Sequence, residues 1–206
     1  MGKIETATQW MIDLANDDSH GYDQDSRWGP DYDCSSSVIS AWQYAGVPVK
    51  TKGASSTYDM KNVFLSCGFT NVISSVNVST GAGLKRGDVL HRSGHTAMYI
   101  GNNKQVAAHL NEKGTTKGGK TGDQTGKEIS VSAYSNSSSN PWTAVLRYTA
   151  EAETTPTQPT TKAGEWIQGS NGKWWYRHTD GTCTKSDWEL IDGSWYYFDA
   201  DGWMMT

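Results

Sequence analysis

Apolar residues recur at helical spacing through the first third of the chain, which predicts amphipathic helices. The predicted helices cover residues 5–15, 35–44 and 56–65. In the second of them Val38, Ile39 and Trp42 supply the apolar side, and Gly46 and Pro48 then end the helix. The polar residues between the first two helices predict a long loop rich in Asp and Gly.

After residue 83 the pattern changes to short, β-prone segments separated by turns. Strands are predicted over residues 88–91, 97–101, 105–110 and 144–148. Helices first and strands afterwards predict the α+β fold class, with N-terminal helices packed on an antiparallel sheet. Residues 111–126, rich in Gly, Thr and Lys, predict a surface loop.

An internal repeat near the C-terminus indicates a second module. The sequence GKWWY at 172–176 recurs as GSWYY at 193–197, and an Asp-Gly turn follows each copy. Each copy predicts a β-hairpin, and such hairpins must stack on one another to bury their aromatic residues. We therefore expect a domain over 1–149, a Pro-containing linker over 150–163, and a small all-β repeat module over 164–206.

The composition narrows the classes of partner. The chain has ten Trp and ten Tyr but only three Phe, and Trp and Tyr suit ligand-binding surfaces because they combine an apolar face with a polar group. The net charge is -4 without a basic stretch, which argues against nucleic acid as a partner. No apolar run is long enough to cross a membrane. The three cysteines are widely spaced and form no CxxC pair, so no disulfide framework, metal site or cofactor is expected.

Cys34 is the first candidate catalytic residue because of its place in the predicted structure. It stands at the start of the helix over 35–44, after a turn-rich stretch and before three serines. The N–H groups of a helix N-terminus favour the thiolate, and we expect a thiolate here at neutral pH. Its neighbours Asp33 and Ser35 are expected to support the site. Cys67, in a helix-ending LSCG stretch, is expected to be a small buried residue.

His95 is the candidate base. It follows Gly94, just before the predicted strand over 97–101, and one edge of the sheet could carry it towards the helix that bears Cys34. A third polar group usually orients such a base by binding its other ring nitrogen. His109 and Asn111 share one strand parity, and either could take this role.

Three motifs carry a resemblance to a known family. They are GPDYDCSSS at 29–37, KRGDV at 85–89 and GHTAMYI at 94–100. With them, most of residues 1–149 resembles the papain-like amidase domains of phage endolysins, which are close to NlpC-type and CHAP hydrolases. The nearest likeness is to the Pal-type N-acetylmuramoyl-L-alanine amidases. The Cys motif with a downstream Gly-His motif is specific to this superfamily, but it discriminates poorly between amidases and endopeptidases.

The resemblance implies a papain-like cysteine hydrolase fold with Cys34 as the nucleophile and His95 as the base. It implies His109 as the third polar residue if this hairpin is two residues longer than is usual in the family. Without that insertion Ala107 takes the position, which would be a departure. Residues 107 and 109 face the same way in a strand, so the insertion is compatible with the geometry. Asn111 remains the alternative.

Two further patterns are weaker. GTTKGGKT at 114–121 matches a P-loop, but the Gly-rich residues that follow cannot form the helix that a P-loop needs. The acidic residues between 17 and 31 lack the spacing of an EF-hand. A calcium site at Asp23 and Asp25 would fit some CHAP domains, but a solvated acidic loop is the better interpretation.

The C-terminal repeats resemble the choline-binding and related cell-wall-binding repeats of Gram-positive lysins. That resemblance implies that aromatic residues from successive hairpins surround a quaternary ammonium group by cation–π attraction. The residues expected to contact the wall ligand are Trp166, Trp174, Tyr176, Trp188, Trp195, Tyr197 and Trp203. The first repeat departs from the family pattern at residues 176–178, so wall binding is expected and choline is one candidate ligand.

We therefore expect a peptidoglycan hydrolase that cleaves the amide bond between N-acetylmuramic acid and L-alanine. Its expected partners are peptidoglycan and, through the repeats, wall teichoic acid or a choline-like ligand. One alternative is an endopeptidase that cuts the stem peptide or cross-bridge, and another is a catalytically inactive wall-binding protein. A glycosidase is disfavoured because no carboxylate pair stands out. The sequence begins without a signal-peptide pattern, so we expect synthesis in the host cytoplasm and release to the cell wall.

Overall fold

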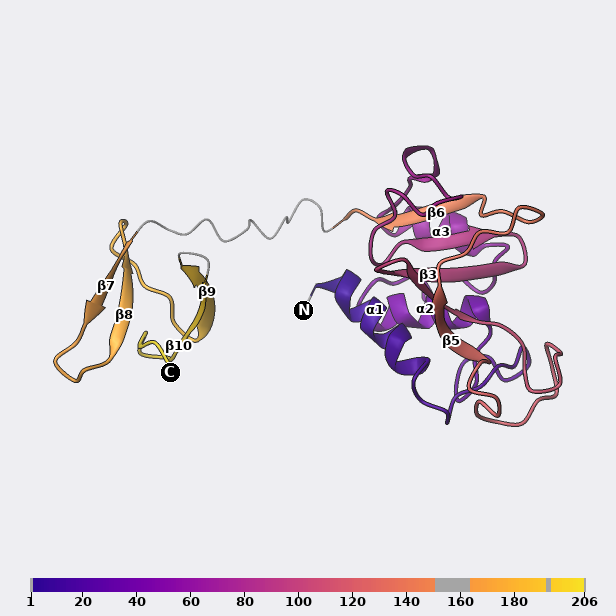
Figure 1. Cartoon of the computed structure of the whole chain (residues 1–206), viewed down its shortest axis with the longest axis horizontal. Helices are drawn as coiled ribbons and strands as arrows, with labels where there is room; N and C mark the ends of the chain where they lie inside the picture. The colour runs from indigo at the N-terminus through magenta and orange to yellow at the C-terminus, as the bar shows by residue number, and fades with distance from the viewer. Residues whose placement is uncertain (1, 151–163, 192–193, 206) are drawn as a thin grey trace. The chain divides into compact units, whose positions relative to one another are not determined.

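The chain forms two compact units, Met1–Glu151 and Ala152–Thr206 (Figure 1). The computed structural model describes residues 2–150, 164–191 and 194–205. Apart from residue 150, the linker expected over 150–163 lies outside the described residues. Among the helices of the described part, none has the length and apolarity that a membrane crossing needs.

Helices come first in the first unit. They are α1 (Lys3–Leu14), α2 (Cys34–Tyr44) and α3 (Met60–Ser66). The first two lie where the apolar spacing predicts them. The helix predicted over 56–65 begins later, at Met60, because the Asp59 carboxylate accepts hydrogen bonds from the N–H groups of Ser55 and Ser56 at 2.7 and 3.0 Å. Such local bonding holds those residues in a turn that competes with the helix.

The strands of the first unit form an antiparallel sheet in the order β1-β6-β2-β3-β4-β5. They are β1 (Phe69–Asn71), β2 (Val89–Arg92), β3 (His95–Gly101), β4 (Lys104–Ala108), β5 (Ile129–Ala133) and β6 (Ala144–Tyr148), and a 3-10 turn (η1, Ile73–Ser75) follows β1. The four predicted strands are present. The sequence pattern does not predict β1, which is very short, or β5, in which serines alternate with apolar residues. The α+β class is confirmed.

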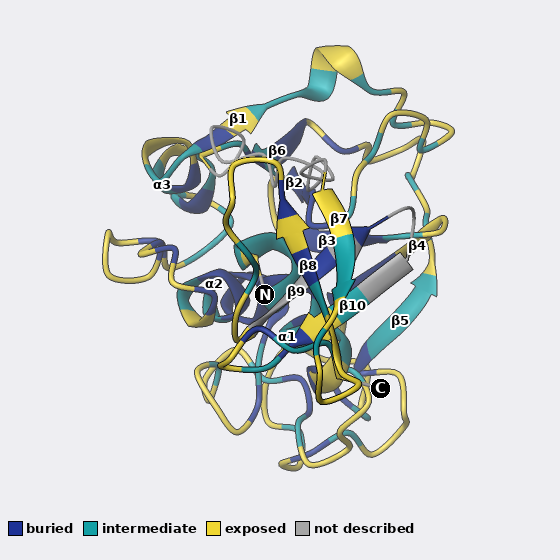
Figure 2. Cartoon of the chain, turned by 90° about the vertical axis from the view of Figure 1, so that its left-hand side faces the viewer, coloured by how far each residue is buried: buried dark blue, intermediate teal, exposed yellow. Residues whose placement is uncertain are grey.

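The main core lies between the helices and one face of the sheet. Trp42 of α2 is fully buried, and its ring centroid lies 4.7 Å from that of Phe69 and 5.3 Å from that of Tyr148. Buried residues run along α2 and through β2 and β3 (Figure 2). A second apolar cluster occupies the opposite face of the sheet and contains Leu90, Ala97, Tyr99, Ala107, Trp142 and Val145. The sheet is therefore covered on both faces, and its edges and ends carry the polar groups.

The second unit contains two antiparallel hairpins in its described part, as the sequence repeat predicts. One pairs β7 (Gly164–Gln168) with β8 (Trp174–His178), and the other pairs β9 (Asp187–Ile191) with β10 (Ser194–Phe198). Their shared core consists of Tyr176, Ile191 and Phe198, with Trp166, Tyr196 and Met204 packed against it. The hairpins thus bury their aromatic residues on one another.

A buried polar chain also joins the two hairpins. His178 of β8 places Nε2 2.8 Å from Glu189 Oε1 of β9, and its Nδ1 lies 2.8 Å from the Thr182 hydroxyl. The Thr184 hydroxyl donates to Glu189 Oε2 at 2.6 Å. His178 thus contributes a buried, hydrogen-bonded contact between the two hairpins.

Candidate functional site

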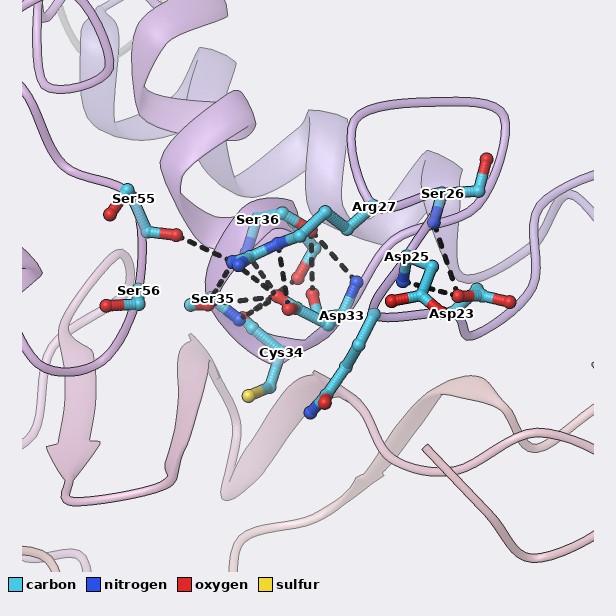
Figure 3. A network of polar contacts seen from close by, with 12 residues as sticks. Asp23, Asp25, Ser26, Arg27, Asp33, Cys34, Ser35, Ser36, Ser55 and Ser56 are labelled. Atoms are coloured by element: carbon cyan, nitrogen blue, oxygen red, sulfur yellow. Dashed lines mark hydrogen bonds and ion pairs between the residues drawn. The ribbon is translucent and has the colours of Figure 1, made fainter. Parts of the chain in front are cut away.

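Cys34 is the first residue of α2, and a capping box fixes where that helix begins. The Asp33 carboxylate accepts hydrogen bonds from the N–H groups of Ser35 and Ser36 at 2.9 and 2.7 Å (Figure 3). In return the Ser36 hydroxyl accepts a hydrogen bond from the Asp33 N–H at 2.9 Å. The helix therefore starts at a defined residue, and its N-terminal end carries the Cys34 side chain.

Arg27 ties this cap to the surrounding loops (Figure 3). Its Nε lies 2.9 Å from the Asp33 carboxylate, and its Nη2 donates to the Ser35 hydroxyl and to the Ser55 carbonyl oxygen, both at 2.7 Å. The two expected supporting residues, Asp33 and Ser35, both belong to this network. Sequence reasoning missed Arg27. It is the only Arg or Lys between residues 16 and 33, so it was the one nearby cation that could pair with the acidic cap residue Asp33.

Asp31 joins the loop before α2 to a loop far along the chain. Its buried carboxylate accepts hydrogen bonds from the N–H groups of Gly21 and Gly122, both at 2.9 Å. Gly21 is required by close approach, because a Cβ there would lie 2.2 Å from the Gly122 carbonyl oxygen. The buried Glu128 carboxylate adds a hydrogen bond from the Tyr22 N–H at 2.9 Å. The walls of the site thus depend on both loops.

The two weaker sequence patterns have structural roles. The segment 114–121 is irregular and no helix follows it before β5, as its sequence predicts. Asp25 forms an exposed ion pair with Lys117 at 2.7 Å. Within residues 2–150, 164–191 and 194–205, no group of three or more His, Cys, Asp or Glu side chains is arranged to hold a metal ion.

The Cys34 thiol is buried where α2 meets β3. Burial and the neighbouring Asp33 carboxylate raise the pKa of Cys34 to about 11. Hydrogen bonds from the backbone N–H groups of Thr96 and Ser35 act in the opposite direction. The helix N-terminus therefore favours the thiolate, as expected, but burial outweighs it. The expectation of a thiolate at neutral pH is corrected: the resting group is a thiol.

Tyr22 borders the same thiol. Burial and the nearby Cys34 raise the pKa of Tyr22 to about 12, so its hydroxyl keeps its proton at neutral pH. Gln24 Nε2 donates a hydrogen bond to this hydroxyl at 3.2 Å. Sequence reasoning missed Tyr22 because it lies in a loop without periodic pattern.

His95 begins β3, next in sequence to the residue whose N–H reaches Cys34. Its ring stacks on Trp142 with centroids 5.8 Å apart and an interplanar angle of 21°. Burial, followed by the positive charge of Arg92, lowers the pKa of His95 to about 4. The imidazole is therefore neutral at pH 7 and able to accept a proton.

His109 is brought beside His95, whereas Asn111 is engaged elsewhere. The ring centroids of His95 and His109 lie 6.1 Å apart, and burial lowers the pKa of His109. The Asn111 side chain accepts hydrogen bonds from the N–H groups of Lys113 and Thr115 at 3.0 and 3.1 Å, so it organises its own loop. Ala107 packs in the apolar cluster of the sheet.

The site lies where β3 and β4 separate. In the described register, the β3–β4 pair nearest the site is Met98 with Val106. Strand β3 nevertheless extends three residues further, to His95. Thr96 lies in this extension, which pairs with β2 on one side but has no described partner in β4 on the other, and its N–H bonds to Cys34. The N-terminal end of α2 thus takes the place that a strand partner would otherwise fill.

The second unit carries an aromatic cavity of about 340 Å³ lined by Trp166, Trp174, Tyr196 and Met204. Of these, Trp166 and Trp174 are among the expected ligand contacts, and Tyr196 is not. Strand alternation indicates which residues share a face, but it does not say which face packs on the next hairpin.

Other expected ligand contacts lie elsewhere. Tyr176 is buried and packs edge-on against Trp166 with centroids 5.2 Å apart, so most of its surface is taken up by the hairpin core. Tyr197 and Trp203 keep part of their surface exposed. The side chains of Trp188 and Trp195 lie outside the described residues.

Comparison with known proteins yields two family matches. A family model described as an endolysin-like domain matches residues 29–106 and 105–163, which include Cys34, His95 and His109. A model described as a putative cell wall binding repeat matches residues 186–204. No curated protein matches the chain.

Proposed function

Because the chain belongs to the endolysin-like domain family, whose members act on peptidoglycan, we propose that its Cys34–His95 site cleaves the amide bond between N-acetylmuramic acid and L-alanine. The observation that carries this proposal is the meeting of α2 and β3. There a buried thiol touches the backbone N–H that follows His95, and His95 is a neutral imidazole. A thiol and a neutral base are the two groups that cysteine-type acyl transfer needs.

In the proposed reaction, His95 takes the proton of the Cys34 thiol as the sulfur attacks the amide carbonyl. Backbone N–H groups at the start of α2 stabilise the resulting oxyanion. The amide C–N bond then breaks, and the His95 imidazolium gives its proton to the leaving amine of L-alanine. Water, deprotonated by His95, hydrolyses the thioester and regenerates the thiol. His109 orients His95 throughout.

Mass spectrometry of digested peptidoglycan tests the bond assignment. An amidase releases stem peptides with a free L-alanine amino terminus and leaves the glycan intact. Cys34→Ala should abolish these products, and Cys67→Ala, a half-buried cysteine at the end of α3, should retain them. Full activity in Cys34→Ala would rule out the cysteine mechanism.

The nearest alternative is an enzyme with the same catalytic residues that cleaves a different bond of peptidoglycan. An endopeptidase would cut the stem peptide or cross-bridge and expose amino termini other than that of L-alanine. The Cys and His motifs fit both enzymes, so the product decides between them. A chain that binds walls but releases no fragment would instead be an inactive wall-binding protein.

We propose that the second unit holds the enzyme on the cell wall, where it acts after its release from the host cytoplasm. The match to a putative cell wall binding repeat supports this role. The cavity formed by Trp166, Trp174, Tyr196 and Met204 suits the quaternary ammonium group of choline, which aromatic faces attract. Retention of the chain on a choline resin, and elution by free choline, tests the ligand. Binding to purified walls without binding to the resin would favour another wall polymer such as teichoic acid.

A further inference from the structure

Two adjoining hollows lie along α1, and neither Cys34 nor His95 lines them. One, of about 230 Å³, is lined by Trp10, Asp13, Leu14, Asp17, His20 and Tyr32. The other, of about 220 Å³, is lined by Thr6, Gln9, Trp10, Asp13 and Tyr44. Because both contain Trp10 and Asp13, they form one groove that follows the helix. We call it the α1 groove.

Aromatic rings line the α1 groove without serving the core alone. Tyr44, the last residue of α2, is 70% exposed. Trp10 is half-buried and meets Tyr32 edge-on, with centroids 5.6 Å apart and an interplanar angle of 88°. The exposed ring of Tyr44 and the partly exposed ring of Trp10 offer flat apolar surfaces to a ligand.

Polar side chains alternate with these rings. Gln9 Nε2 donates to the Asp13 carboxylate at 2.7 Å, which fixes the orientation of that carboxylate in the middle of the groove. His20 holds its ring by a 2.6 Å contact between Nδ1 and the Pro30 carbonyl oxygen. Asp13 and Asp17 make the groove acidic, so it repels phosphate and carboxylate groups and favours ligands that donate hydrogen bonds.

We propose that the α1 groove binds the glycan strand of peptidoglycan, with sugar rings stacked on Tyr44 and Trp10 and sugar hydroxyls donating to Asp13. This inference rests on the proposed peptidoglycan substrate. A sugar ring combines apolar C–H faces with hydroxyl edges, which matches the alternation of rings and acceptors. An extended groove shared by two hollows fits a linear polymer better than a compact group. The acidic character excludes the anionic wall polymers and the carboxylate-rich stem peptide. The catalytic unit thereby holds its substrate independently of the repeats.

Calorimetric titration of the full chain with a peptide-free tetramer of N-acetylglucosamine tests the groove. The Cys34→Ala background prevents turnover. Tyr44→Ala and Asp13→Ala should each weaken binding about fivefold, since each removes one stacking or hydrogen-bonding contact. Both residues are exposed, so neither variant removes core packing. Tyr58→Ala is the matched control, because Tyr58 is 95% exposed on the same unit and outside the groove. Trp174→Ala controls for binding by the repeats.

Each outcome decides between clear alternatives. Binding that is equal in Tyr44→Ala, Asp13→Ala and the parent would overturn the groove as the glycan site, as would the absence of any tetramer binding. Tighter binding of a lysine-containing stem peptide than of the tetramer, lost in Tyr44→Ala, would overturn the glycan as occupant. The tetramer contains no bond that the proposed amidase cleaves, so its binding tests the groove alone. Product analysis tests the amidase assignment separately.

Discussion

At the residue scale, the candidate site combines a thiol and an imidazole whose pKa values are pushed apart. The pKa of Cys34 is raised to about 11 and that of His95 is lowered to about 4, in both cases chiefly by burial. Burial disfavours the charged form of either group, so both are neutral at pH 7. In the proposed reaction, proton transfer from Cys34 to His95 therefore accompanies attack on the substrate and is not completed beforehand.

Activity should persist well below pH 6.5. His95 acts as a base only when unprotonated, and its lowered pKa means that it gains a proton only as the pH falls towards about 4. kcat/KM on a soluble peptidoglycan fragment should therefore stay level from pH 7 to about 5 and decline below that. An acidic limb centred at the ordinary imidazole value of 6.5 would contradict this assignment.

Arg92 supplies a matched variant for that measurement. Its positive charge helps to lower the pKa of His95, so Arg92→Gln should move the acidic limb to higher pH. Lys104→Gln removes an exposed cation at the start of β4, at the opposite end of the β3–β4 hairpin from His95. This variant should leave the acidic limb of the pH profile unchanged. Because Arg92 also stacks on Trp142, circular dichroism should confirm that the variant is folded.

At the scale of elements, α2 shows how polar contacts specify where a helix begins. Its sequence CSSSVISAWQY is rich in serine and β-branched residues, which have modest helix propensity. The Asp33 cap and its ion pair with Arg27 supply the missing specification. The placement of Cys34, the proposed nucleophile, is therefore sensitive to residues such as Asp33 and Arg27 that only hold the helix start in place.

Asp33→Ala should lower the free energy of unfolding by at least about 2 kcal/mol, because it removes the helix cap and leaves Arg27 without its buried partner. Asp33→Asn, which keeps the capping oxygen and loses the charge, should fall between this variant and the parent. Asp25→Ala breaks an exposed ion pair of similar length and should change little. Urea titration gives the free energy of unfolding of each variant. Equal losses of stability in Asp33→Ala and Asp25→Ala would refute the stabilising role of the Asp33 cap.

The joint between the two hairpins is a second element held by polar contacts. Glu189→Ala would leave the buried His178 ring without its carboxylate partner, at a cost of about 1–3 kcal/mol to the second unit. Hydrogen exchange of β8 and β9 in the full chain should accelerate, while α2 and β3 should exchange as before. Unchanged exchange in β8 and β9 would mean that the aromatic core alone joins the hairpins.

The sequence predicts the elements with strong periodicity and misses those without it. The helix start at Cys34 follows from an Asp and serines before an apolar face, and the hairpin at His95 follows from its strand pattern. Strand β5 is an exception, because its sequence ISVSA does alternate apolar residues with serine and could have been predicted. Arg27 escapes because its ion pair depends on how a loop returns to α2, which no local pattern encodes.

The same limit explains the aromatic residues of the repeats. Alternation correctly separates the two faces of each hairpin, but it cannot say which face meets the neighbouring hairpin. Tyr176 turns inwards, and Tyr196 reaches the cavity instead. The choice depends on contacts between hairpins, which only the folded unit contains.

At the scale of the whole molecule, the catalytic and wall-binding roles that we propose belong to separate compact units. A tether between two binding units raises the effective concentration of one at the ligand of the other. Residues 1–150 alone should therefore cleave soluble fragments at the parent rate but lyse whole cells at least about tenfold more slowly. Turbidity assays on cells, beside cleavage of soluble fragments, measure the two effects. Undiminished cell lysis by residues 1–150 would show that the repeats do not deliver the enzyme.

The hydrogen bond from Gly122 to Asp31 has a consequence for the order in which the enzyme matures. It links residues 91 positions apart, and contacts of such separation form slowly because closing a long loop costs entropy. The loop that precedes α2 and borders the Cys34 thiol cannot reach its final conformation until residue 122 and its neighbours have been synthesised and folded. Hydrolytic capacity should therefore appear in one late step and be missing from partly synthesised chains. Alkylation of Cys34 during refolding follows this directly: protection of the thiol should lag behind the helix signal, and simultaneous appearance of the two would rule out the delay.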